Sequence, residues 1–202
     1  MRKLALLVGF VVSSAAFAAT PPAGVPLEVR RGFFTETGLG GAFTVGGANG
    51  YSNFQLYLQL GAGYQLTIND NKGLIPIGLH VGFGSNAQNC WGDVNTSDAC
   101  VQADNFTMTF INATAGYLHR FGDGYITSRL YGGGKIVGGV SLLDPAPIAN
   151  GGLVYPNAGI VGALEFASMV DHFSAGLDIG YRLIIGPNIN ALSFAVRVQY
   201  TF

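Results

Sequence analysis

Three histidines are the side chains of this chain best suited to proton transfer near neutral pH. His80, His119 and His172 have no Ser or carboxylate at a spacing typical of a catalytic site. Asp171 does precede His172, but a polar pair of this kind is typical of a solvated turn. The sequence therefore predicts no catalytic residue and no metal site at these positions.

A glycine-rich run, Gly132–Lys135, has a superficial likeness to a phosphate-binding loop. That motif needs a Gly five residues before its second Gly, and a Ser or Thr directly after its Lys. Arg129 and Ile136 stand at those two positions. The run is therefore not a nucleotide site, and we expect neither a cofactor nor a nucleic-acid partner.

Titratable side chains of both signs recur at polar positions of segments that are otherwise apolar on alternate residues. They are Glu36, His80, Arg129, Lys135, Glu165, Asp178, Arg182 and Arg197. If these segments enclose one interior, the charges must be paired or solvated, because an isolated buried charge is costly. Their mixed signs predict a salt-bridged plug, and a narrow polar channel for small solutes is the alternative.

The segments that carry these charges have the period of two that is typical of β-strands. In 51–66 the even-numbered residues from Phe54 to Leu66 are apolar, and the odd-numbered residues are Asn, Gln, Gly or Tyr. The other segments with such alternation are 32–45, 74–85, 125–137, 157–168, 173–185 and 191–202. The segment 105–118 is less regular, because its apolar face changes from even positions such as Phe110 to odd positions such as Ile111.

These segments predict an all-β fold, a transmembrane antiparallel up-and-down β-barrel of about eight strands. Each segment is long enough for the roughly 9–11 residues that a tilted strand needs to cross a bilayer. Closure removes the strand edges, whose backbone groups lipid could not satisfy. The interior of so small a barrel is filled by side chains, and a wide pore would need about twice as many strands.

Composition and the N-terminus place this fold in an exported chain. Only 10% of the 202 residues are charged although 49% are hydrophobic, whereas soluble domains carry roughly 25% charged residues. Arg2 and Lys3, an apolar run over 4–12 and the sequence Ala16-Phe17-Ala18 predict a cleavable signal peptide over 1–18. We expect 19–31 to be a periplasmic lead-in and 32–202 to form a barrel in the cell outer membrane.

The two cysteines, Cys90 and Cys100, lie in one polar stretch of the exported part. An oxidising compartment favours a disulfide between them. A metal site is the alternative, but no second pair of ligands and no His lies nearby.

The last segment of the chain carries the most specific local pattern. Its alternating apolar residues are Phe194, Val196, Val198, Tyr200 and Phe202. Bacterial outer-membrane barrels commonly end in this way, and the barrel-assembly machinery reads the final strand. We therefore expect outer-membrane lipid and this machinery among the partners.

The predicted connections alternate in length, with turns at 67–73, 119–124 and 169–172 and outer loops at 46–50, 86–104, 138–156 and 186–190. The two longest connections both fall on the outer side, as is usual for such barrels. The loop 138–156 is apolar for a loop and contains Leu142, Leu143, Asp144 and Pro145. It is a candidate docking surface for another protein, and folding of the loop over the barrel mouth is the alternative.

Several segments together resemble the adventurous gliding motility CglE family of myxobacteria and their relatives. They are Arg31–Glu36, Tyr51–Gly61, Gly84–Cys90, Asp104–Thr107, Leu143–Pro147, Asp171–Ser174 and Ile185–Ile189. The likeness covers nearly all of the mature chain. It implies a non-enzymatic outer-membrane protein that takes part in gliding motility within a larger envelope assembly, and it brings no catalytic residues.

The expected function is therefore that of a structural or interaction component of a gliding-motility or cell-envelope complex. A narrow channel is the first alternative. An outer-membrane lipid-modifying enzyme that uses one of the histidines is the second.

Overall fold

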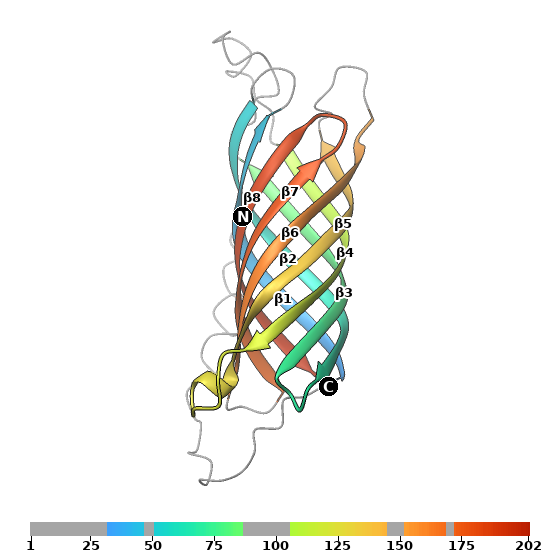
Figure 1. Cartoon of the computed structure of the whole chain (residues 1–202). Coiled ribbons are helices and arrows are strands. Elements are labelled where there is room, and N and C mark those ends of the chain that lie inside the picture. Colours follow the sequence, from blue (N-terminus) through green and yellow to red (C-terminus); the bar gives the residue numbers. More distant parts are fainter. Residues whose placement is uncertain (1–31, 47–50, 87–105, 145–151, 169–171) are drawn as a thin grey trace, which may run out of the picture.

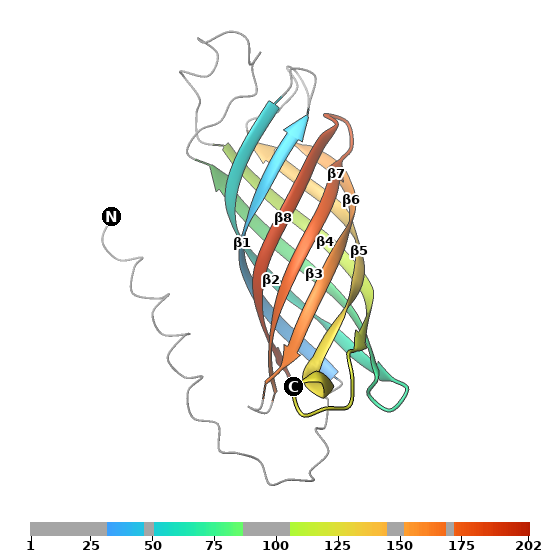
Figure 2. The same ribbon diagram turned by 60° about the vertical axis from the view of Figure 1, so that its left-hand side comes forward.

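The computed structural model describes residues 32–46, 51–86, 106–144, 152–168 and 172–202. Their elements are β1 (Gly32–Gly46), β2 (Tyr51–Ile68), β3 (Gly73–Asn86), β4 (Phe106–Arg120), the 3-10 helix η1 (Thr127–Arg129), β5 (Leu130–Asp144), β6 (Val154–Ala167), β7 (Phe173–Ile184) and β8 (Ile189–Thr201). Each strand pairs antiparallel with the next, and β1 also pairs with β8, so the sheet closes on itself (Figures 1 and 2). The predicted eight-stranded antiparallel barrel is confirmed. No helix in the described ranges is long and apolar enough to span a membrane.

The strand registers fix the tilt of the barrel. If paired residues are followed from strand to strand around the barrel, starting at Phe34 on β1, the path returns to β1 at Thr44. The shear number of the barrel is therefore ten residues. With about 3.3 Å per residue along a strand and about 4.8 Å between strands, this shear implies a tilt of about 40°. Such a barrel has an interior that side chains fill.

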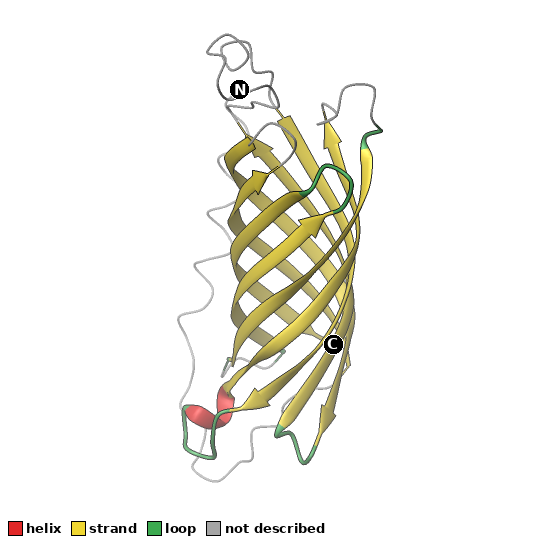
Figure 3. Cartoon of the chain, turned by 45° about the horizontal axis from the view of Figure 1, so that its top comes forward, coloured by secondary structure: helices red, strands yellow, loops and turns green. Residues whose placement is uncertain are grey.

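The two ends of the barrel differ in their connections. We call the end with the β1–β2, β3–β4, β5–β6 and β7–β8 connections the loop end. We call the opposite end, with the β2–β3, β4–β5 and β6–β7 connections, the turn end, and Gly32 and Thr201 also lie there. Figure 3 shows η1 at the turn end, in the connection between β4 and β5.

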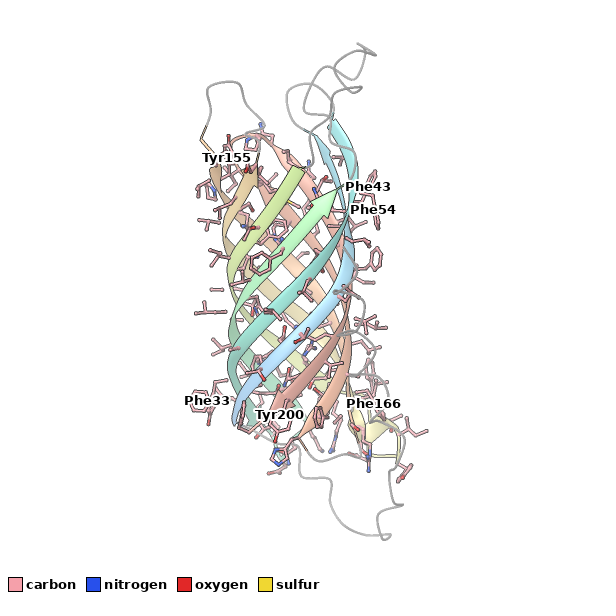
Figure 4. All side chains as sticks on the ribbon, turned by 180° about the vertical axis from the view of Figure 1, so that it is seen from behind. Phe33, Phe43, Phe54, Tyr155, Phe166 and Tyr200 are labelled. Carbon is pink, nitrogen blue, oxygen red and sulfur yellow. The ribbon has the colours of Figure 1, made fainter. Side chains whose placement is uncertain are left out.

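The outer surface of the barrel is mostly apolar. Leu79 on β3 and Ile136 on β5 are 67% and 68% exposed, respectively, and point away from the lumen. Aromatic rings lie on this surface at two heights, with Phe43 and Phe54 toward the loop end and Phe33 toward the turn end (Figure 4). An apolar band between two aromatic girdles is typical of a barrel that faces lipid.

Two predicted segments differ from the structure for one physical reason. Residues of β4 alternate between lumen and exterior along the whole strand: Met108 and Phe110 point into the lumen, and Ile111 points outward. The predicted loop 138–156 is also mostly strand, since β5 continues to Asp144 and β6 begins at Val154. Toward the loop end the lumen itself is apolar, so both faces of these strands carry apolar side chains and the polar–apolar alternation disappears.

The start of β5 was predicted too early, at residue 125. Residues 127–129 form η1 instead, and the strand begins at Leu130. Ser128 N donates to Gly124 O at 2.8 Å and Arg129 N donates to Ile126 O at 3.0 Å, so local turns take the hydrogen bonds that a strand would give to its neighbours.

We expect the cost of an outward charge to depend on depth. Leu79 lies at the middle of β3, and Ile68 lies at the turn-end limit of β2. Leu79→Arg should destabilise the barrel in lipid vesicles by about 2–4 kcal/mol, whereas Ile68→Arg should cost about 1 kcal/mol or less. The measurement is a urea titration in which the folded fraction is read as the fast-migrating band of unboiled protein on a denaturing gel. Equal costs at the two positions would contradict a lipid-facing band.

Candidate functional site

Arg197 on β8 lies at the centre of the lumen and contacts three carboxylates. Its Nη1 lies 3.4 Å from Glu36 Oε2, its Nη2 lies 3.1 Å from Glu165 Oε2, and its Nε lies 3.5 Å from Asp178 Oδ2. These carboxylates come from β1, β6 and β7. A guanidinium suits this position because it is planar and presents five N–H donors in a fixed geometry. One cation thus ties together four strands.

Two further titratable groups complete this cluster. Lys135 Nζ on β5 lies 3.0 Å from Asp178 Oδ2, and His80 Nε2 on β3 lies 2.8 Å from Glu36 Oε1. We call Glu36, His80, Lys135, Glu165, Asp178 and Arg197 the lumen network. All of these side chains are buried or nearly so.

Neutral polar side chains extend the lumen network to the remaining two strands. Gln59 on β2 donates from Nε2 to Glu36 Oε1 at 3.3 Å. Thr114 Oγ1 on β4 lies 3.2 Å from His80 Nδ1. Hydrogen bonds and ion pairs therefore connect one residue from every strand of the barrel.

Glycines explain how these side chains reach one another. Glu36 and His80 both pair with Gly61, which lies between them on β2. Arg197 and Glu165 both pair with Gly176, which lies between them on β7. A Cβ at Gly61 would lie 2.3 Å from His80 Cδ2, and a Cβ at Gly176 would lie 2.8 Å from Arg197 Nη2. Each charged pair thus spans an intervening strand through space that only glycine leaves open.

The structure brings together six of the eight titratable residues expected to share the lumen. Arg129 lies apart from them in η1, buried at the turn end, with its Cζ 5.4 Å from the centroid of the Tyr125 ring. Arg182 lies four residues beyond Asp178 on β7, so the two Cα atoms are about 13 Å apart along the strand and Arg182 is the nearer to the loop end. Its Cζ lies 4.0 Å from the centroid of the Phe110 ring. The expectation of a single set including these two arginines is corrected. Arg129 lies in η1 and not on a strand, and for Arg182 an inward position on a strand does not fix its height in the lumen.

A polar chain leads from the lumen network toward the turn end. Arg197 Nη1 donates to Gln199 Oε1 at 2.8 Å, and Gln199 Nε2 donates to Gln65 Oε1 at 2.9 Å. Sequence reasoning did not single out these glutamines, Gln59 or Thr114. The sequence feature that could have identified them is their position on the lumen face of strands that also carry charged residues.

Apolar layers lie on both sides of the polar centre. The layer toward the loop end consists of Met108, Phe110, Leu143, Tyr155, Ile184 and Ile189. The layer toward the turn end consists of Leu74, Leu118, Tyr131 and Ala163. A cavity between His80 and Arg182 has a volume of about 10 Å³, which is room for about one water molecule. Buried side chains therefore occupy the lumen at each of these three levels.

One series of polar contacts has the order of groups found in serine hydrolases. Thr114, His80 and Glu36 supply a hydroxyl, an imidazole and a carboxylate in turn. The series lies in the filled lumen, where the adjoining cavity is too small for a substrate larger than water. We therefore interpret it as part of the lumen network.

The other two histidines lie outside the lumen network. His119 Nδ1 lies 3.2 Å from the hydroxyl of Tyr117 on the exposed surface. His172 stacks on the Tyr200 ring at the turn end, with a centroid distance of 5.2 Å. Across the described ranges, no three His, Cys, Asp or Glu side chains are grouped so that they could hold a metal ion.

The candidate partner loop needs correction. Leu142, Leu143 and Asp144 belong to β5, and Leu143 is fully buried in the loop-end apolar layer, so its side chain cannot dock a protein. Pro145 and the cysteines Cys90 and Cys100 lie outside the described residues.

The apolar residues of the C-terminal segment face outward on β8. Phe194, Val196 and Val198 are exposed, and Tyr200 packs edge-on against Phe202 with a centroid distance of 5.1 Å. Phe202 N donates to Phe33 O at 2.8 Å, so the last residue is hydrogen-bonded to β1. The segment thus forms the seam at which the barrel closes.

No family model and no curated protein matches the chain. Among solved structures, it is similar to Neisserial surface protein A (NspA), with 16% identity over 84% of this chain and 97% of that chain and a TM-score of 0.57. Weaker likenesses are to the outer membrane enzyme PagL (10% identity, 84% and 99% coverage, TM-score 0.47) and to Ail, the attachment invasion locus protein of Yersinia pestis (14%, 85% and 99%, 0.46). At these identities the likeness to NspA shows a shared barrel fold, and we draw nothing from the two weaker ones.

We expect removal of the central cation to be far more costly than removal of a surface cation. Arg197→Met leaves three buried carboxylates without their shared partner, which should destabilise the barrel by about 3–5 kcal/mol. Arg120→Met removes an ion pair with the exposed Asp123 and should cost about 1 kcal/mol or less. Urea unfolding in lipid vesicles measures both changes, and similar losses for the two variants would refute the central role of Arg197.

Two glycine substitutions test the close approach across strands. Gly61→Ala places a Cβ against His80 and Glu36, and such overpacking should cost about 1–3 kcal/mol. Gly138→Ala is the matched control, because the atom that its Cβ would approach is Asn157 O, at an unstrained 3.9 Å. The control should leave the urea midpoint unchanged or raise it slightly. If Gly61→Ala were equally harmless, the space at Gly61 would not be needed.

Proposed function

We propose that the chain is a non-enzymatic outer-membrane β-barrel that serves as a structural or interaction component of a cell-envelope complex. Its apolar exterior with aromatic rings at two heights supports a location in lipid. The barrel fold that it shares with NspA and the expected signal peptide over 1–18 agree with that location.

The observation that carries this proposal is the filled lumen. The lumen network occupies the centre, and an apolar layer lies on each side of it. A conduit for solutes needs a continuous path, whereas the cavity beside His80 holds about one water molecule. The side chains of the interior thus stabilise the barrel, and contacts with other molecules are made by its surface.

A small group of exposed apolar side chains at the loop end suits contact with another protein. It consists of Leu142, Leu153, Val154 and Ile185, and we call it the loop-end patch. Its backbone is held in place, because Leu143 N donates to Leu153 O at 2.8 Å and Ile185 N donates to Pro156 O at 2.9 Å. Exposed apolar side chains on a fixed backbone often mark a protein contact.

The resemblance of the sequence to the adventurous gliding motility CglE family supports a motility complex as the assembly in question. In that case the loop-end patch faces outward from the cell and contacts another envelope or motility protein.

Site-specific photo-crosslinking in the source cells tests this proposal. A photoreactive phenylalanine analogue replaces Leu153 in the loop-end patch, and the same analogue replaces Asp70 in the turn between β2 and β3 as the control. We expect a discrete protein adduct from position 153 and none from position 70. The double change Leu142→Asp with Val154→Asp should preserve the heat-modifiable barrel but abolish the adduct.

Absence of any adduct at position 153 would contradict docking through the loop-end patch. Survival of the adduct in the double variant, with the barrel folded, would also contradict it.

A further inference from the structure

Arg182 is a cation of the lumen that contacts no carboxylate among the residues that the structure describes. No acidic side chain of the described residues lies within 4.0 Å of its guanidinium, and its Nε is buried without a hydrogen-bond partner there. Its described contacts are the face of the Phe110 ring and the side-chain amide of Asn112. In the amide orientation that gives both its oxygen and its nitrogen a hydrogen-bond partner, Asn112 Oδ1 accepts from Arg182 Nη2 at 3.2 Å. These neutral contacts orient Arg182 but do not neutralise its charge.

The three carboxylates of the lumen network form ion pairs with cations other than Arg182. Glu36, Glu165 and Asp178 all contact Arg197, and Asp178 also contacts Lys135. The Cα atom of Asp178, on the same strand as Arg182, lies about 13 Å from that of Arg182 along the strand. A guanidinium removed from water without a close counter-charge is costly, so an anion beside Arg182 would stabilise the fold.

The cavity next to Arg182 has the chemistry that an anion needs. Its polar lining includes the hydroxyl-bearing side chains of Tyr57 and Ser193 together with Asn112 and His80, and no carboxylate lines it. Its volume is about 10 Å³, so it admits about one water-sized body. Sulfate and phosphate have five heavy atoms and are too large for that space, whereas chloride is a single ion that is only somewhat larger than a water molecule.

We infer that this cavity binds one monovalent anion of about the size of chloride. The guanidinium of Arg182 supplies the charge, and the side chains of Tyr57, Ser193 and Asn112 supply polar lining. The Ser193 hydroxyl also donates to Gly180 O at 3.4 Å. A water molecule would fill the same volume without neutralising Arg182, so the response to anions distinguishes the two occupants.

Thermal unfolding of the purified full-length barrel in detergent tests the site. The protein is compared in sodium chloride and in sodium gluconate at equal ionic strength, since gluconate is too large to enter. We expect chloride to raise the Tm by about 2–4 °C in a saturable manner. Arg182→Gln should abolish the difference between the salts, whereas Arg120→Gln, at the exposed pair with Asp123, should retain it.

A second variant keeps the test valid if Arg182→Gln does not fold. Ala191 lines the cavity and is buried, so Ala191→Val retains the cation but takes up the space, and it should also lose the chloride response. In crystals soaked in bromide, one anomalous peak should lie within hydrogen-bond distance of Arg182. An equal chloride effect in wild type and both variants, no chloride effect in the wild type, or no bromide peak at Arg182 would overturn the inference.

Discussion

The burial of three carboxylates around one guanidinium is the interaction on which the rest of this barrel depends. Arg197 contacts Glu36, Glu165 and Asp178, and through Gln59, His80, Thr114 and Lys135 the connected groups include every strand. Buried charges tolerate neither a shift in register nor the loss of one member, because either change leaves an unpaired charge in a medium of low dielectric. The lumen network therefore fixes which residues of adjacent strands can face each other, in addition to the backbone hydrogen bonds.

The same constraint explains the composition of the interior and the character of the surface. Long charged side chains need room, and Gly61 and Gly176 provide it on the strands that lie between paired charges. The apolar layers toward both ends reduce access of water to the charges, which strengthens their attraction. An interior organised in this way supports a closed barrel, and what remains for function is the surface, chiefly the loop-end patch.

Much of the fold could be predicted from the sequence, because a membrane barrel with a polar lumen imposes a period of two that survives in single segments such as 51–66. The sequence-based prediction is wrong where the lumen is apolar. Leu143 lies on the interior face of β5, whereas the sequence predicts a loop for its segment. The alternation of inward and outward residues identifies the lumen charges but not their heights, so it places Arg182 with residues that it does not contact. Arg129 lies in η1, where strand alternation does not apply. Gln59 and Thr114 could not be recognised, because neutral polar residues acquire importance only from the registers of neighbouring strands.

Conductance of the purified protein in planar lipid bilayers tests the central claim most directly, since a lumen filled by the lumen network and its two apolar layers has no continuous path for ions. Protein that is shown to be inserted and heat-modifiable should give no single-channel steps over a wide range of voltages. Steps of reproducible size in the wild type would show that water threads the barrel, and would contradict a closed lumen and the structural role assigned to it.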